Sequence, residues 1–298
     1  MSPNSTAEMP GELGTFAPFG EFDETLDSAE SVGVDSGATL VKLCIRRSGG
    51  DLHFGTWPSP SRDRVLALLD DLAPERVGIT GCGSPGVLGG LGRQAANPIE
   101  FDAWGHGANH MLDRQGLAGD EAYLLVSIGT GTSALLVDGD RVERVGGTAL
   151  GGGTALGLGL TLTDCRSHSE LAALAARGDR GRVDLLISDV YPDSEIPLAA
   201  EATAAAFGKL ARSPEEKPLP EDLAAAIMGL VAENIALLSI AQARAAEVSR
   251  IVYGGSTLID NDRVIDTVRL LGAVMGVESI VLPRGSHVGA LGSMLLGT

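Results

Sequence analysis

Four short apolar segments in this sequence each run directly into a turn of glycine, serine and threonine residues. They cover residues 32–39, 77–86, 125–133 and 251–257. Each segment has the pattern of a strand followed by a tight turn. Glycine lets backbone amides approach a phosphate closely, and Ser and Thr hydroxyls add donors. One such loop indicates only a turn, but four predict an α/β chain whose loops converge on an anionic ligand.

The turns do not match the two commonest phosphate-binding motifs. None has the pattern G-x-x-x-x-G-K-[ST], so the chain is not a P-loop protein. No G-x-G-x-x-G follows the first strand, which argues against a Rossmann dinucleotide domain. The anionic ligand therefore needs another architecture.

The order of apolar patterns along the chain predicts two lobes behind a polar arm. Residues 1–30 are acidic and rich in Pro, Gly and Ser, and we expect them to be disordered. Residues 31–125 form the predicted N-terminal lobe and residues 126–298 the C-terminal lobe, in line with the length of 298 residues. Apolar spacing predicts helices over 62–72, 102–115, 167–177, 199–210, 221–248, 263–276 and 287–296.

The charge balance excludes several classes of partner. The net charge is 22 − 39 = −17, which repels nucleic acid and anionic membranes. Residues 1–41 hold eight Asp or Glu and no Lys or Arg, so the remainder carries −17 + 8 = −9, which is ordinary for a soluble enzyme. Solubility accounts for this acidity without a specific partner.

The termini and cysteines favour a cytoplasmic protein. The N-terminus has no basic region followed by an apolar stretch, so it is not a secretory signal. The uncharged run at 145–163 is too rich in glycine for a membrane span. The three cysteines contain no C-x-x-C pair, and the histidines have no metal-like pairing.

Several segments together resemble the type II pantothenate kinases over about residues 32–296. The most specific is the long middle one, which contains G-T-G-T-S, a hairpin, R-V-G-G-T and G-G-G in that order. The segments are VDSGATLVK (34–42), EFDAWGHG (100–107), SIGTGTSALLVDGDRVERVGGTALGGGTALGLG (127–159), GDRGRVDLLISDVY (178–191), ATAAAFGKL (202–210) and IVYGGSTLIDN (251–261). The resemblance implies two α/β lobes of the actin, hexokinase and Hsp70-like ATPase type, a ribonuclease H-like fold, with ATP in the cleft.

The first phosphate loop begins at Asp35, which ends an apolar strand. By resemblance its carboxylate organises Mg²⁺ near the ATP phosphates, since Mg²⁺ prefers oxygen ligands; a turn-capping Asp is the alternative. Gly37 and Thr39 belong to the turn that would contact phosphate. Lys42 is either a phosphate-binding charge or an exposed strand lysine. Ala38 stands where the family has glycine, and it would be strained if its φ were positive.

Glu100 is the residue that we expect to carry the chemistry, because the family's Glu-Phe-Asp-Ala matches here residue for residue. A primary alcohol barely ionises at neutral pH, so a positioned carboxylate must accept its proton as attack develops. Such a general base contributes roughly 10²–10⁴-fold. Asp102 is the rival base, although an Asp before Ala103 also suits a helix N-cap.

The remaining site residues are implied by the resemblance. Arg144 is placed on the substrate, near the transferring group, where a planar cation suits a carboxylate or developing phosphoryl charge; a surface Arg paired with Glu143 or Asp140 is the alternative. Glycine turns would bind ATP, and two hydroxyls would lie beside pantothenate. The ATP-binding candidates are Gly129, Thr130, Gly131, Gly151, Gly152, Gly153, Gly254, Gly255 and Ser256, and the substrate-binding hydroxyls are those of Thr130 and Ser133.

The resemblance implies transfer of phosphate from MgATP to the 4′-hydroxyl of pantothenate, the entry to coenzyme A synthesis. It also implies a homodimer, with the long helix at 221–248 as interface candidate, although a core helix within one subunit explains the apolar composition of that helix equally well. Coenzyme A or an acyl-CoA is a candidate inhibitor. Two alternatives stay open. The chain could phosphorylate another small alcohol, such as pantetheine or an amino sugar, or it could be a non-catalytic ATP-binding regulator.

Overall fold

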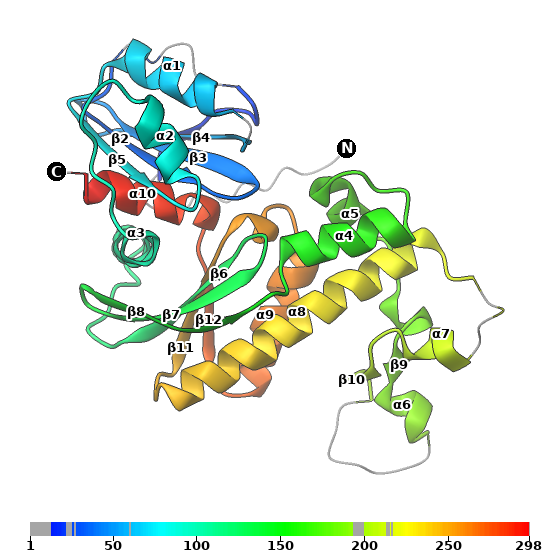
Figure 1. Cartoon of the computed structure of the whole chain (residues 1–298). Coiled ribbons are helices and arrows are strands. Elements are labelled where there is room, and N and C mark those ends of the chain that lie inside the picture. The colour runs from blue at the N-terminus through cyan, green and yellow to red at the C-terminus, as the bar shows by residue number, and fades with distance from the viewer. Residues whose placement is uncertain are drawn as a thin grey trace. The chain divides into compact units, whose positions relative to one another are not determined.

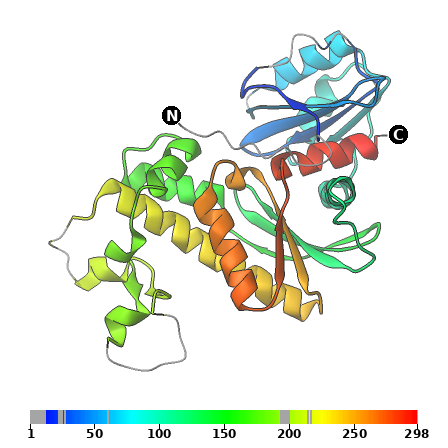
Figure 2. The ribbon, with the colours of Figure 1, turned by 180° about the vertical axis from the view of Figure 1, so that it is seen from behind.

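The computed structural model describes residues 13–21, 26, 28–59, 61–192, 200–212, 215 and 217–297. The chain divides into two compact units (Figures 1 and 2). Unit 1 comprises Met1–Leu125, Leu135–Val145 and Leu282–Thr298, and unit 2 comprises Val126–Ala134 and Gly146–Val281. The chain passes from unit 1 to unit 2 between Leu125 and Val126, and it returns to unit 1 twice. These returns depend on packing between distant segments, which local sequence patterns do not report.

Unit 1 is built on a five-stranded sheet in the order β1-β4-β3-β2-β5. Its strands are β1 (Thr15–Phe16), β2 (Ser31–Ser36), β3 (Leu40–Arg46), β4 (Leu52–Pro58) and β5 (Arg76–Thr80). The hairpin strands β2, β3 and β4 are antiparallel, and β5 runs parallel to β2. Every residue of β2 is buried, as expected for a strand covered on both faces.

The two faces of β2 carry different residues because side chains alternate along a strand. Val32 and Val34 belong to the hydrophobic cluster that includes Leu69 of helix α1 (Arg62–Leu72). Gly33 and Asp35 lie on the other face, which helix α10 (Val288–Leu295) covers (Figure 1). The apolar face of β2 thus packs in the hydrophobic core, while the other face contacts the chain's last helix.

Helix α10 approaches its neighbours more closely than a Cβ would permit. A Cβ on Gly33 of β2 would overlap the carbonyl oxygen of Ala290, and one on Gly78 of β5 would overlap that of Ser293. Helix α10 also packs against α3 (Glu100–Arg114), where a Cβ on Gly292 would overlap the carbonyl oxygen of Ala103. Glycine is therefore required here for close approach of backbones.

Part of the N-terminal segment that we expected to be disordered forms a strand. Thr15 and Phe16 form β1, which pairs with β4. The Phe16 ring stacks on Phe54 with centroids 4.7 Å apart, and the Arg284 guanidinium lies 3.3 Å from its centroid. Residues 1–12, 22–25 and 27 lie outside the described residues.

A second five-stranded sheet has the order β12-β11-β6-β7-β8. Its strands are β6 (Tyr123–Ile128), β7 (Thr132–Asp138), β8 (Arg141–Thr148), β11 (Arg250–Gly254) and β12 (Glu278–Val281). In unit 2, helix α8 (Pro220–Ala245) packs with α4 (Gly152–Leu162), α5 (His168–Ala175) and α9 (Asp262–Val274) (Figure 2).

Helix α8 is long and apolar enough to cross a membrane by length and composition, but 67% of its most apolar window is buried within the protein. Its buried side includes Ile227, Val231 and Ile235, and the helix contacts α5 and α9. Its apolar composition is therefore that of a core helix.

The predicted helix over 199–210 is wrong for residues 203–205 and is confirmed only for residues 208–210. Thr203–Ala205 form strand β10, which pairs with β9 (Leu185–Leu186), and α7 begins only at Gly208 and ends at Arg212. The Thr203 hydroxyl contacts Arg180 and Glu233 at 2.8 and 2.9 Å. These tertiary contacts override the helical propensity of the alanine-rich stretch. Short elements also missed by the sequence patterns are α2 (Ser84–Gly90) and α6 (Ile187–Val190).

The close approach of α10 predicts a specific sensitivity. We expect Gly292→Ala to lower the free energy of unfolding by about 2–3 kcal/mol, because its Cβ would overlap a backbone oxygen that cannot rotate away. Gly89→Ala is the matched control in the same unit, since nothing lies within 4 Å of its added Cβ. The control should leave stability unchanged or raise it by up to about 1 kcal/mol. Urea unfolding measures both, and equal stabilities for the two variants would contradict the packing.

Candidate active site

Asp35 and Lys42 form a buried ion pair because of the register of the first hairpin. The two residues lie directly opposite each other in the β2–β3 pairing. The Lys42 Nζ lies 3.2 Å from Asp35 Oδ2, and the side chains are only 12% and 3% exposed. Lys42 is therefore not an exposed strand lysine.

Two glycines border the Asp35 carboxylate. A Cβ on Gly81, which follows β5 at φ +91°, would lie 2.8 Å from Asp35 Oδ1. A Cβ on Gly289 of α10 would lie 2.9 Å from Asp35 Oδ2 and 2.8 Å from Trp104 Nε1. Both glycines and the Trp104 indole thus fix the space around this carboxylate. Gly81 could be found from its place in the turn after a buried strand, whereas no sequence pattern indicated Gly289.

Glu100 is the first residue of helix α3, after an N-cap at Ile99. The helix begins two residues earlier than expected, so Asp102 lies inside the first turn and is not the N-cap. The hydroxyl of Thr80, at the end of β5, donates to the carbonyl of Pro98 at 3.0 Å. This bond ties the segment before Glu100 to the strand next to Asp35.

The environment of Glu100 raises the pKa of its carboxyl group. Burial of the carboxyl is the largest cause, and the negative charge of Asp35 adds to it, while Lys42 acts in the opposite direction. The residue keeps accessible surface all the same. The structure therefore brings three predicted site residues, Asp35, Lys42 and Glu100, within electrostatic reach of one another. A carboxylate with a raised pKa is a stronger proton acceptor when ionised.

Arg144 lies in β8, exposed, on the strand that packs against α3. Along the hairpin of β7 and β8, later residues contact earlier residues of α3. Gly139 O accepts from Asn109 Nδ2 at 2.8 Å, and Val142 packs on Gly105. Arg144 follows two residues later on the same side of the strand as Val142, toward the first turn of α3.

The neighbours of Arg144 do not neutralise it. Glu143 pairs with Arg141 at 3.0 Å, and the nearest ion-pair contact of Asp140 is His106 at 3.9 Å. Within the described part of the chain, no ion pair of Arg144 is found. Its guanidinium is thus free to bind an anion.

The turn after Asp35 keeps a relaxed backbone. Gly37 N donates to Leu40 O at 3.0 Å, and the Ser59 hydroxyl donates to Gly37 O at 2.6 Å. Ala38 is not among the residues with positive φ, so the strain considered from the sequence does not arise. Ala38 and Thr39 are exposed, where a ligand can reach them.

Three predicted glycine segments come together in unit 2. Thr257 Oγ1 donates to Gly129 O at 2.9 Å, which links the 254–257 turn to the loop between β6 and β7. Gly255, at φ +118°, packs so tightly on Ile128 that a Cβ would overlap its carbonyl oxygen. A Cβ on Gly151 would lie 2.8 Å from Gly129 O. The glycines at these turns serve contacts between loops.

The start of helix α4 is partly occupied by these contacts. Gly152 N donates to Gly129 O at 2.8 Å, and Gly153 N donates to Thr130 O at 2.9 Å. These two amides therefore hold the loops together and are not available to a ligand. Hydroxyls remain at the surface of the loops, with Thr130 exposed and Ser133 and Ser256 partly exposed.

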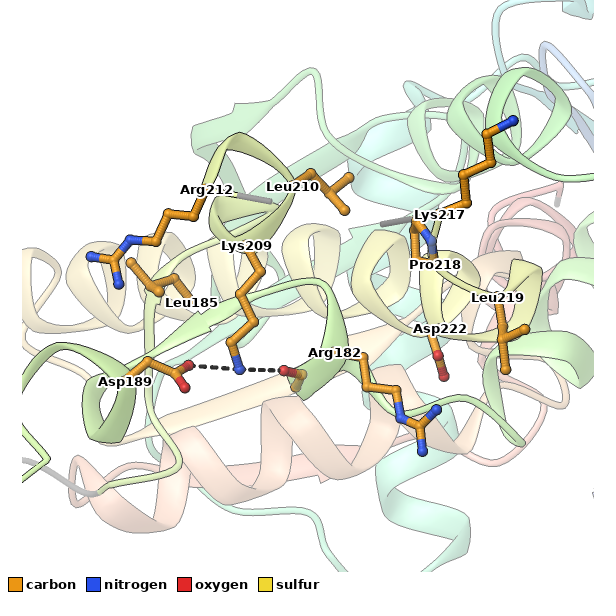
Figure 3. Close-up of a pocket in the computed structure, with 11 residues that line it drawn as sticks. Arg182, Leu185, Asp189, Lys209, Leu210, Arg212, Lys217, Pro218, Leu219 and Asp222 are labelled. Carbon is orange, nitrogen blue, oxygen red and sulfur yellow. Dashed lines mark hydrogen bonds and ion pairs between the residues drawn. The ribbon is translucent and has the colours of Figure 1, made fainter. Parts of the chain in front are cut away.

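A cavity of about 580 Å³ lies elsewhere in unit 2 (Figure 3). Its wall includes Arg182, Lys209, Arg212 and Lys217, and Lys209 contacts Asp189 at 2.8 Å and Gly181 O at 2.6 Å. None of the predicted site residues lines it. We do not assign it to the candidate site.

Metal binding at this site depends on few protein ligands. Among the residues that the structure describes, no group of three His, Cys, Asp or Glu could hold a metal ion. Mg²⁺ in phosphoryl-transfer enzymes is bound by one or two carboxylates together with phosphate oxygens and water. The single carboxylate of Asp35 fits that donor set.

Comparison with known proteins identifies related sequences. The family model described as Fumble matches residues 111–296. A type II pantothenate kinase from Staphylococcus saprophyticus is 32% identical over 265 residues, which is 89% of this chain and 99% of the relative. One from Oceanobacillus iheyensis is 35% identical over 265 residues, or 89% of this chain and 98% of the relative.

Two solved structures show the fold. An activator of 2-hydroxyisocaproyl-CoA dehydratase from Clostridium difficile, with bound ADPNP, has a TM-score of 0.59 at 19% identity and covers 90% of this chain and 93% of its own. A ROK family glucokinase from Streptomyces griseus, in complex with glucose and AMPPNP, has a TM-score of 0.54 at 16% identity and covers 90% and 98%. The expected α/β fold of the actin, hexokinase and Hsp70-like ATPases is confirmed.

The charges around Glu100 predict opposite shifts of its pKa in two variants. Lys42→Met should raise the pKa of Glu100, because the positive charge that lowers it is lost. Asp35→Asn should lower the pKa, because a like charge is removed. Carboxyl-detected NMR titration measures both. Lys42→Arg, which keeps the charge, should leave the pKa near that of the unsubstituted protein; shifts of the same sign in the first two variants would contradict the cluster.

Proposed function

Because this chain belongs to the type II pantothenate kinase family, described as Fumble, we propose that it phosphorylates the 4′-hydroxyl of pantothenate with ATP. The product would be 4′-phosphopantothenate, the first intermediate toward coenzyme A. The observation that carries the proposal is the cluster of Glu100, Asp35 and Lys42 in unit 1, in which a carboxyl with a raised pKa stands near a buried ion pair.

Glu100 is the proposed general base. Its carboxylate accepts the proton of the 4′-hydroxyl while the oxygen attacks the γ-phosphorus of ATP. The bond between the γ-phosphorus and the β–γ bridging oxygen breaks, and ADP leaves. The loose transition state of phosphoryl transfer requires mainly position and charge, which a carboxylate fixed at a helix start supplies.

Asp35 and Lys42 provide the charges for the phosphates. A Mg²⁺ ion held near Asp35 would neutralise charge on the ATP phosphates when bound. Lys42 contacts Asp35 in the structure, so its ammonium is positioned and its charge reaches Glu100. Ala38 and Thr39 are the exposed part of the turn, and their backbone amides are the proposed donors for phosphate.

Arg144 is the proposed substrate-binding cation. It lies exposed on β8, on the side of the strand that packs against α3, and its acidic neighbours pair elsewhere. A planar guanidinium binds a carboxylate or a phosphoryl group through two parallel hydrogen bonds. The Thr130 and Ser133 hydroxyls are the proposed polar contacts of pantothenate.

The loops of unit 2 are the proposed nucleotide-binding part. The candidates are Gly129, Gly131, Gly151, Gly152, Gly153, Gly254, Gly255 and Ser256. Their support is that the three loops contact one another through hydrogen bonds and close glycine packing. Since the Gly152 and Gly153 amides are engaged, donors to ATP come from other atoms of these loops.

We further propose a cytoplasmic homodimer. The exposed Leu237 and Leu238 of α8, at 48% and 38%, are apolar surface that association would cover. Light scattering of the purified protein tests the assembly. Coenzyme A and its thioesters are the effectors to titrate in the assay below.

Glu100→Gln tests the base directly. We expect kcat to fall by about 10²–10⁴-fold with little change in the KM for ATP, because the amide cannot accept the proton. Asp102→Asn is the matched control on the same helical turn, and it should retain activity within a few-fold. Unchanged kcat in the Glu100 variant would disprove the assignment, and the absence of turnover in the unsubstituted protein would favour a regulator.

The substrate is tested by a panel of alcohols. Pantothenate should give the highest kcat/KM, because Arg144 recognises its carboxylate, which pantetheine and glucosamine lack. The Arg144→Gln variant should lower the ratio of kcat/KM for pantothenate to kcat/KM for pantetheine. Coupled measurement of ADP release with each alcohol gives these values. An equal or higher kcat/KM with an amino sugar would contradict pantothenate as the substrate.

A further inference from the structure

A second pocket, in unit 1, lies at the opposite end of helix α3 from Glu100. Its volume is about 370 Å³, and its wall includes Arg46, His110, Arg114 and the turn of residues 48–50. Helix α3 has 15 residues, with Glu100 first and Arg114 last. At a rise of 1.5 Å per residue the two ends are roughly 21 Å apart. The pocket is therefore distinct from the candidate active site.

The two arginines of this pocket have no anionic partner. In the described ranges of the chain, neither Arg46 nor Arg114 makes a side-chain hydrogen bond or an ion pair. Other arginines do, as Arg250 does with Glu278 at 2.8 Å. Arg114 ends α3, where a cation favours the helix dipole, but that explains only one of the two charges. Two guanidinium groups that line one cavity and have no carboxylate partner of their own are typical of an anion site.

The charges of both arginines reach the interior of the pocket. The pKa of His110 is lowered, first by burial and then by Arg114 and Arg46, against a smaller opposite effect of Asp113. Glu30 also lines the pocket, but it pairs with Arg76 at 2.5 Å, so its negative charge is compensated. Of the net charge of −17, −8 belongs to residues 1–41, and salt screens charges beyond about 8 Å at physiological ionic strength.

The turn between β3 and β4 supplies neutral donors. Its own backbone bonds run from Gly50 N to Arg47 O at 2.8 Å and from Arg47 N to Asp51 O at 3.0 Å. Within the described residues, the amides of Ser48 and Gly49 make no backbone hydrogen bond. The Ser48 hydroxyl lies on the same turn and adds another donor.

We propose that this pocket binds a phosphate dianion, either inorganic phosphate or the phosphate group of a small monoester. Two guanidinium groups match the charge of a dianion, and the amides and hydroxyl of the turn can contact its remaining oxygen atoms. The cavity of Figure 3 is a weaker candidate, because its Lys209 is already engaged by Asp189 and Gly181 O.

Titration calorimetry tests the site with inorganic phosphate and, in a separate arm, with glycerol 3-phosphate. A saturating non-hydrolysable ATP analogue is present throughout to occupy the nucleotide site. We expect one bound anion per chain, and a loss of at least about tenfold in affinity in Arg46→Gln and in Arg114→Gln. Arg62→Gln, at an exposed arginine of the same unit, should bind like the unsubstituted protein. The arm with the tighter binding identifies the source of the phosphate group.

A second readout separates binding in this pocket from binding elsewhere. A bound dianion adds negative charge beside His110, so phosphate should raise the pKa of His110 in an NMR titration. By linkage, the affinity expressed per phosphate dianion should be higher when His110 is protonated, and the protonation of free phosphate in the same pH range is subtracted in the analysis. The Arg46→Gln, Arg114→Gln double variant should lose the shift. Absence of binding to both probes, equal affinity in all variants, or an unshifted His110 would overturn the proposal.

Discussion

The close approach of α10 to strands β2 and β5 determines the geometry of unit 1. The helix lies where Gly33 and Gly78 leave no side chain, and its own Gly289 lies against the Asp35 carboxylate. A methyl group at any of these positions would move the helix or the carboxylate. The last segment of the chain therefore fixes a charge that the first strand carries. The positions of Asp35, Lys42 and Glu100 depend on this packing, because α10 contacts both β2 and α3.

Four effects act on the Glu100 carboxyl group, and their balance decides its protonation. The start of a helix favours a negative charge by roughly 0.3–1 kcal/mol, which lowers the pKa of a carboxyl group there. Burial and the Asp35 charge act in the opposite direction and prevail, since the pKa of Glu100 is raised. Lys42 limits this rise and keeps the carboxylate accessible as a base. A proton acceptor for an alcohol needs this balance, because a carboxyl that stays protonated cannot accept a proton.

Local sequence patterns predicted the elements that carry the site, but not the contacts that arrange them. Strand β2 with Asp35 at its end, and the glycine turns after β5, β6 and β11, follow from apolar runs and turn residues alone. The family resemblance added Glu100 and Arg144, whose roles remain proposals. The role of Gly289 could not be predicted, because it depends on a helix about 250 residues away from Asp35 in the sequence. Thr203–Ala205 were mispredicted for the same kind of reason, since Arg180 and Glu233 hold this strand from outside it.

Helix α3 connects the two charged regions of unit 1, and the residues at its two ends carry opposite charges. Its first turn carries the acidic residues Glu100 and Asp102, and its last turn carries Arg114. This order follows the helix dipole, which favours anions at the start and cations at the end. The helix is held along its length by Gly105 on Val142 and Gly107 on Val288, so it is rigidly packed between the β8 hairpin and α10. A rigid helix keeps both regions in fixed positions, and a charge bound at one end can affect the other only by shifting the whole helix. At a separation of roughly 21 Å, more than twice the screening length, direct electrostatic coupling between the ends is weak.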